Sequence, residues 1–122
     1  MLLLQELLQS GVLLKSARCP QDTRWAVSVQ ATNHATAASG LNIFILPSGV
    51  DTLPADPVLR RKYMIEPEAL IISPETQSKR GIYLADPVEV TEGACIAFAT
   101  TAPDNTVGVY VTAFSAPTAF PL

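Results

Sequence analysis

The fold is decided by residues 23–33, T-R-W-A-V-S-V-Q-A-T-N, in which apolar and small polar residues alternate strictly. Trp25, Val27, Val29 and Ala31 fall on one face, because successive side chains of a strand point to opposite sides. The other face carries Ala26, Ser28, Gln30 and Thr32. A period of two over this length predicts a half-buried β-strand.

Similar patterns recur along the chain at intervals of about ten residues. Residues 41–46 (L-N-I-F-I-L) predict the next strand, and the turn of small residues before them indicates a long hairpin with residues 23–33. Residues 106–114 alternate again. Shorter strands are predicted at 69–73, 81–85, 88–91 and 94–100. About seven or eight short strands predict an all-β protein, a single antiparallel, jelly-roll-like β-sandwich over residues 11–114.

The two ends of the chain differ from this pattern. Residues 1–10 are rich in leucine but include Gln5 and Glu6, which predicts an apolar arm or a short amphipathic helix. This segment lacks the basic start of a signal peptide and the roughly 20 apolar residues of a membrane helix. Residues 115–122 contain two prolines and predict an extended tail.

The composition excludes several classes of protein. Of the 122 residues, 48% are hydrophobic and 16% are charged, which argues against a disordered chain and against a coiled coil. The net charge of −3 gives no indication of nucleic-acid binding. Residues 25–50 carry no Asp, Glu, Lys or Arg, and residues 93–122 carry only Asp104. Because charge is depleted from interface cores, this distribution predicts a homo-oligomer.

Residues that could support catalysis or bind a metal are few. His34 is the only histidine and lies in a predicted turn, with no nucleophile at a recognised spacing. Cys19, Cys95 and His34 do not have metal-ligand spacing, and the two thiols are expected to be reduced, although a bridge between them stays open. Glu66 and Glu68 would share one face of an extended chain, as a glycosidase pair could, but solvated carboxylates are the more usual reading. We therefore expect no catalytic residue, no metal and no cofactor.

Two basic clusters stand out in this acidic chain, Arg60-Arg61-Lys62 and Lys79-Arg80. If they lie close together, they form a basic patch for an acidic partner surface. The alternative is a solubilising surface.

Several motifs follow one another between residues 10 and 114. In chain order they are Cys19-Pro20-Gln21-Asp22-Thr23, Ala31-Thr32-Asn33, Leu41–Pro47, Gly81-Ile82-Tyr83-Leu84, Pro87-Val88-Glu89-Val90, Glu92-Gly93-Ala94-Cys95-Ile96 and Val107–Val111. This order resembles that of the small β-sandwich virion structural proteins of tailed bacteriophages. Ala94 departs from the pattern, which often has Asp there. The resemblance rests on strands and turns and includes no catalytic signature.

The resemblance implies a non-enzymatic structural component of the phage virion, assembled in the host cytoplasm. It implies first a capsid cement (decoration) protein, a homotrimer that stabilises the shell through contacts with the major capsid protein. A tail, neck or fibre-attachment protein of the same fold is the alternative. No nucleic acid and no membrane is expected as a partner. The candidate interface residues are Leu2, Leu3, Leu4, Leu7, Leu8, Arg60, Arg61, Lys62 and Phe120.

A carbohydrate-binding sandwich module is a third possibility. It would need a platform of exposed aromatic side chains. The candidates are Trp25, Tyr63, Tyr83 and Tyr110, of which Trp25 lies on a predicted core face.

Overall fold

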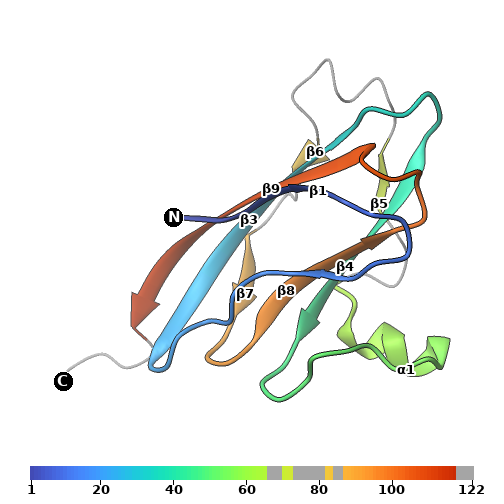
Figure 1. Cartoon of the computed structure of the whole chain (residues 1–122). Coiled ribbons are helices and arrows are strands. Elements are labelled where there is room, and N and C mark those ends of the chain that lie inside the picture. The colour runs from blue at the N-terminus through green and yellow to red at the C-terminus, as the bar shows by residue number, and fades with distance from the viewer. Residues whose placement is uncertain (66–69, 73–81, 84–86, 118–122) are drawn as a thin grey trace.

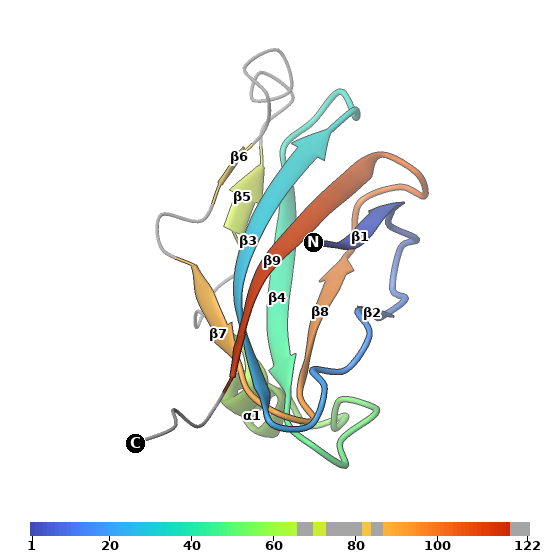
Figure 2. The same ribbon diagram turned by 90° about the vertical axis from the view of Figure 1, so that its left-hand side faces the viewer.

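The computed structural model describes residues 1–65, 70–72, 82–83 and 87–117, and two antiparallel sheets pack face to face in it (Figure 1, Figure 2). The first sheet has the order β1-β9-β3-β6, with β7 also paired to β3. Its strands are β1 (Leu2–Leu7), β3 (Thr23–Asn33), β6 (Ile82–Tyr83), β7 (Val88–Val90) and β9 (Val107–Pro117). The second sheet has the order β2-β8-β4-β5. Its strands are β2 (Leu14–Lys15), β4 (Ser39–Leu46), β5 (Leu70–Ile72) and β8 (Cys95–Thr100). The predicted all-β sandwich is confirmed.

The strand order is that of a jelly roll. β6 and β7 pair with different parts of β3, so they occupy the same position in the first sheet. With these two counted as one position, successive strands lie in alternate sheets except for β4 and β5, which are neighbours. This arrangement matches the double-sheet jelly roll.

The predicted hairpin between the strands now identified as β3 and β4 is wrong. β3 pairs along its whole length with β9, from Thr23 opposite Pro117 to Asn33 opposite Val107. β4 lies in the other sheet and pairs with β8 and β5. Alternation identifies the buried face of a strand but not its hydrogen-bonded neighbour, and β3 and β4 bury their apolar faces in the same core.

The main core lies between the two sheets. It takes the alternating apolar residues of β3 and β9, such as Val27, Val29, Val109 and Val111, together with Phe98 of β8. The buried faces predicted for these strands are therefore confirmed.

A second core covers the outer side of the four-stranded sheet. Four residues of β4 and β8 point away from the main core and are nevertheless buried: Phe44, Leu46, Cys95 and Ala97. Residues 50–65 cover them, and Leu53, Tyr63 and Met64 pack against them. This covering segment includes α1 (Pro57–Arg60) and the 3-10 helix η1 (Arg61–Tyr63).

Residues 1–10 form neither a short helix nor a separate arm. Leu2–Leu7 form β1, which pairs with β9 at the edge of the first sheet. Leu8 is 1% exposed and belongs to the main core. Its N–H donates to the carbonyl of Val107 at 2.7 Å. The edge of β9 offers unpaired backbone groups, and pairing with them takes precedence over the weak helical pattern.

The C-terminal boundary also differs from the predicted one. β9 continues to Pro117, three residues beyond the predicted end of the sandwich at residue 114, because residues 115–117 pair with the start of β3. Residues 118–122, which include Phe120, lie outside the described residues.

Arg18 connects three loops at one end of the sandwich. Its guanidinium donates to the carbonyls of Pro47, Val50 and Gly93 and to the Asp51 carboxylate, the last at 2.7 Å. The Arg18 side chain is 31% exposed, whereas that of Asp51 is 75% exposed. The backbone carbonyls should therefore matter more for stability than the exposed ion pair.

We expect Arg18→Met to lower the free energy of unfolding by about 2 kcal/mol, because three carbonyls lose a charged donor. Asp51→Asn is the matched control and should cost less than about 1 kcal/mol, since it weakens only the exposed ion pair. Urea unfolding curves measure both values. Equal losses in the two variants would contradict this account of Arg18.

Candidate interaction surface

The residues considered for catalysis or metal binding do not come together in the described part of the chain. His34 is exposed in the turn after β3, and its backbone N–H donates to the carbonyl of Thr106 at 2.6 Å. No group of three His, Cys, Asp or Glu side chains suited to a metal is found among the residues that the structure describes. Glu66 and Glu68 lie outside those residues.

Cys19 and Cys95 are both free and buried, in different cores. Cys19 lies in the main core, where its Sγ donates to the carbonyl of Thr23 at 3.3 Å. Cys95 lies in the second core, on the other side of the four-stranded sheet. Desolvation by burial raises the pKa of each thiol above its ordinary value. The two side chains are therefore not placed to form a bridge.

We expect neither thiol of the folded chain to react rapidly with Ellman's reagent at about pH 8, because thiolate is the reactive form and both groups are buried. Both should react at once in denaturant. Raised pKa values also contribute stability that is present below the ordinary thiol pKa of 9.0 and is lost as the pH rises above it. A rapidly reacting thiol in the native chain would contradict the burial of that cysteine.

The side of the five-stranded sheet that points away from the main core carries almost no charge, and we call it the outer face. Its central residues are Leu2, Gln5, Leu7, Ala26, Ser28, Gln30, Thr32, Gly108, Tyr110, Thr112 and Phe114. Charged side chains lie at its margins, with Glu6 on the edge strand β1 and Arg24 and Glu89 around one end of β3. A surface of this composition can be covered by another protein at low desolvation cost.

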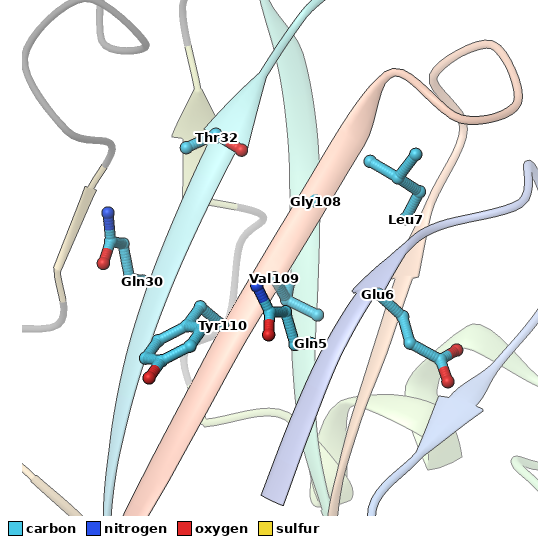
Figure 3. A pocket seen from close by; sticks show the side chains of 8 residues that line it. All are labelled: Gln5, Glu6, Leu7, Gln30, Thr32, Gly108, Val109 and Tyr110. Carbon is cyan, nitrogen blue, oxygen red and sulfur yellow. The ribbon is translucent and has the colours of Figure 1, made fainter. Parts of the chain in front are cut away.

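A hollow of about 490 Å³ lies on the outer face around Gly108 (Figure 3). Thr32 of β3 and Leu7 of β1 lie on either side of Gly108, with Tyr110 and Gln5 along one end of the hollow. A Cβ atom at position 108 would lie 3.2 Å from the Leu7 side chain and 3.3 Å from that of Thr32. The absence of a side chain at Gly108 therefore lets the side chains of Leu7 and Thr32 approach the strand closely at the floor of this hollow.

Phe114 projects from the other half of β9. Its side chain is 83% exposed, the highest value among the large hydrophobic residues that the structure describes as exposed. It lies opposite Ala26 of β3 and lines a smaller hollow with Arg24, Pro87 and Glu89. An almost fully exposed phenylalanine on a neutral sheet face indicates a contact with another molecule.

The predicted interface leucines divide into three groups. Leu8 is in the chain's own core and is not available to a partner. Leu3 and Leu4 are half-buried and pack against that core. Only Leu2 and Leu7 are substantially exposed, at 51% and 47%, and by register they lie on the outer face.

The first basic cluster lies on α1 and η1, in the segment that covers the four-stranded sheet, and not on the outer face. Arg61 and Lys62 are exposed, and Arg60 is half-buried beside a hollow of about 370 Å³ that Lys15 and Asp51 also line. Lys79-Arg80 lies outside the described residues, so the predicted joint patch stays a prediction.

Of the four aromatic residues considered for a carbohydrate-binding platform, the structure describes one as exposed, Tyr110. Trp25 is 4% exposed in the main core, and Tyr63 is half-buried in the second core. Tyr110 is exposed on the outer face, and the side chain of Tyr83 lies outside the description.

Phe114 and Gly108 are the residues of the outer face that sequence reasoning missed, and Tyr110 was considered only as a member of an aromatic platform. The signal was present, because alternation within residues 106–114 puts all three on the face opposite the buried valines. Two aromatic residues on the predicted solvent face of a strand should have marked it as an interaction surface.

No helix in the described part of the chain is long and apolar enough to cross a membrane. Comparisons with protein-family models, with curated proteins and with solved structures found no match to this chain.

Proposed function

We propose that this chain is a structural protein of a tailed-phage particle, and first a capsid cement protein that reinforces the shell by adhesion. The observation that carries the proposal is the outer face, a neutral surface with exposed Leu2, Leu7, Tyr110 and Phe114. A monomeric protein seldom exposes so many large apolar side chains on one face. The jelly-roll order of the strands, a fold used in viral capsids, supports the same proposal.

The proposed mechanism needs contact surfaces and no chemistry. Copies of the chain associate with one another through weakly polar faces, for which the resemblance implies a homotrimer. The exposed residues Arg61 and Lys62 on η1 then lie away from the five-stranded sheet and are available to an acidic surface of the major capsid protein. Assembly in the host cytoplasm belongs to this proposal.

Cosedimentation with purified particle components tests the proposal. The labelled chain should pellet with purified capsids of its phage and stay in the supernatant with purified tails. A double Arg61→Gln/Lys62→Gln variant should bind capsids more weakly at low salt, because exposed charges steer and strengthen such contacts. Binding to neither component would contradict the proposal.

The second candidate function is that of a tail, neck or fibre-attachment protein, which the same fold and the same outer face support. Pelleting with tails but not with capsids would favour it. A carbohydrate-binding module has less support, because Trp25 is buried and the exposed aromatics Tyr110 and Phe114 lie on a single strand.

A further inference from the structure

We propose that two copies of this chain pair through their outer faces, with Phe114 of each copy seated in the Gly108 hollow of the other. This inference rests on the self-association in the proposed function, but not on the phage particle, and it takes a two-fold pair in place of the homotrimer that the resemblance implies.

The projecting part of the contact is Phe114. Its ring is exposed although its strand is central in the sheet, and its neighbour Ala26 across the strand pair is too small to cover it. Large aromatic side chains that enter a pocket on a partner are typical of the energetically dominant residues of interfaces.

The receiving part of the contact is the Gly108 hollow. It lies on the same face of the same strand, and its walls include the apolar side chain of Leu7 and the ring of Tyr110. Its volume of about 490 Å³ leaves room for a phenyl ring. Tyr110 can offer that ring an aromatic contact as well as apolar area.

The spacing of the two features makes the surface self-complementary. Gly108 and Phe114 are six residues apart on β9, which corresponds to about 20 Å along a strand. A two-fold axis midway between them, at the level of Val111, exchanges the two positions. The Phe114 ring of each copy then enters the hollow of the other copy, which is the isologous arrangement of a symmetric dimer.

The centre of the outer face allows this approach. The outward residues nearest the axis are Ser28 and Thr112 on one side and Gln30 and Tyr110 on the other, and none of them is charged. Arg24, Glu89 and Glu6 lie at the ends or the edge, where they keep their contact with water. An uncharged centre with a charged rim is the usual layout of a protein interface.

The face is also large enough. β3 and β9 each have 11 residues and are therefore about 36 Å long. β1 adds 6 residues, and β6 and β7 add 2 and 3. At about 3.3 Å by 4.8 Å per residue, the sheet has a flat footprint of about 520 Å². Side-chain relief adds to this area and brings it towards the lower end of the roughly 600–1,000 Å² per partner of a stable interface.

The first test is the mass of the free chain in solution. Light scattering at micromolar concentration should give twice the 13.0 kDa of one chain. Phe114→Ser should raise the dissociation constant at least about 30-fold. Val58→Ser, which removes a 70% exposed apolar side chain on α1, is the matched control and should leave the mass unchanged. Urea unfolding of the monomeric form establishes that Phe114→Ser is folded.

The second test fixes the register of the two copies. In a double Leu7→Cys/Phe114→Cys variant, oxidation at a concentration high enough to offset the loss of the Phe114 ring should give a covalent dimer, because the new cysteine at position 114 of one copy meets the one at position 7 of the other. Leu7 is paired with Gly108, so the two positions are too far apart within one chain to be bridged. Phe114→Cys alone should not cross-link.

Three results would overturn the inference: a monomeric wild type, a trimer, or a double-cysteine variant that does not cross-link at that concentration. Each is distinguishable from failure of the proposed function, which is decided by binding to capsids and tails.

Discussion

Removal of residues 1–9 is expected to destabilise the whole sandwich, by about 4 kcal/mol or more in the free energy of unfolding. The truncation removes β1 from the edge of the five-stranded sheet and Leu8 from the main core. Loss of a buried leucine side chain alone costs about 2–5 kcal/mol. Backbone hydrogen bonds are lost as well, including the one from the N–H of Ala113 to the carbonyl of Met1 at 2.8 Å. Because domains of this size are stable by about 5–15 kcal/mol, much of the chain should then unfold or aggregate.

Two substitutions separate the contribution of the core from that of the surface. Leu8→Ala should reproduce a large part of the loss, whereas Leu7→Ser, at a residue that is 47% exposed, should cost less than about 1 kcal/mol. Urea denaturation followed by tryptophan fluorescence reports on all three variants, because Trp25 is in the main core. A truncated chain as stable as the full one would support the prediction from the sequence that this segment is an arm separate from the sandwich.

Phe44→Ala is expected to cost about 3–5 kcal/mol, as the removal of a fully buried phenylalanine does. Phe44 is 2% exposed, but it faces away from the main core and belongs to the second core, against which residues 50–65 pack. The prediction therefore tests whether this segment is a fixed layer of the fold. If it is, the cavity left by the ring cannot be filled without moving Tyr63 and Met64.

Val58→Ala is the control for this layer, because Val58 lies on α1 and its side chain is largely exposed. It should change the free energy of unfolding by less than about 0.5 kcal/mol. A loss below about 1 kcal/mol in Phe44→Ala would mean that the second core does not contribute to stability and that residues 50–65 are a loop over an open sheet face.

The strands of the sandwich could be predicted because their patterns are local. In residues 23–33 and 106–114 the period of two separates core from surface, and the buried sets are those expected. The hydrogen-bonded partner of each strand was harder to predict, since β3 pairs with β9 across more than seventy residues of sequence. A local pattern contains no information on such a distant partner.

β1 and the second core could not be predicted for a related reason. Leu2–Leu7 adopt a strand because β9 offers an unpaired edge, which is a property of the assembled sheet. β8 is apolar on both faces, and its sequence C-I-A-F-A-T does not reveal which element covers the second one. Phe114 lies on the face opposite the buried valines, and the prediction for residues 106–114 concerned only those valines.

The low fraction of charged residues can now be assigned to particular strands of the two sheets. The stretches 25–50, which has no charged residue, and 93–122, which has only Asp104, contain most of β3 and all of β9, the two central strands of the outer face. They also contain β4 and β8, whose outer side is covered by the chain itself. One face is therefore covered within the molecule, and the other remains for a partner. This distinction directs the proposed assembly contacts to the five-stranded sheet.

The proposed cement function is tested most directly by the copy number of the chain in purified phage particles. Quantitative mass spectrometry against the major capsid protein measures this number without any assumption about the contact surface. A cement protein should be present in copies on the order of hundreds per particle, because it repeats with the capsid lattice. A dozen copies or fewer would place the chain in the tail or neck, and its absence from the particle would contradict the proposed function.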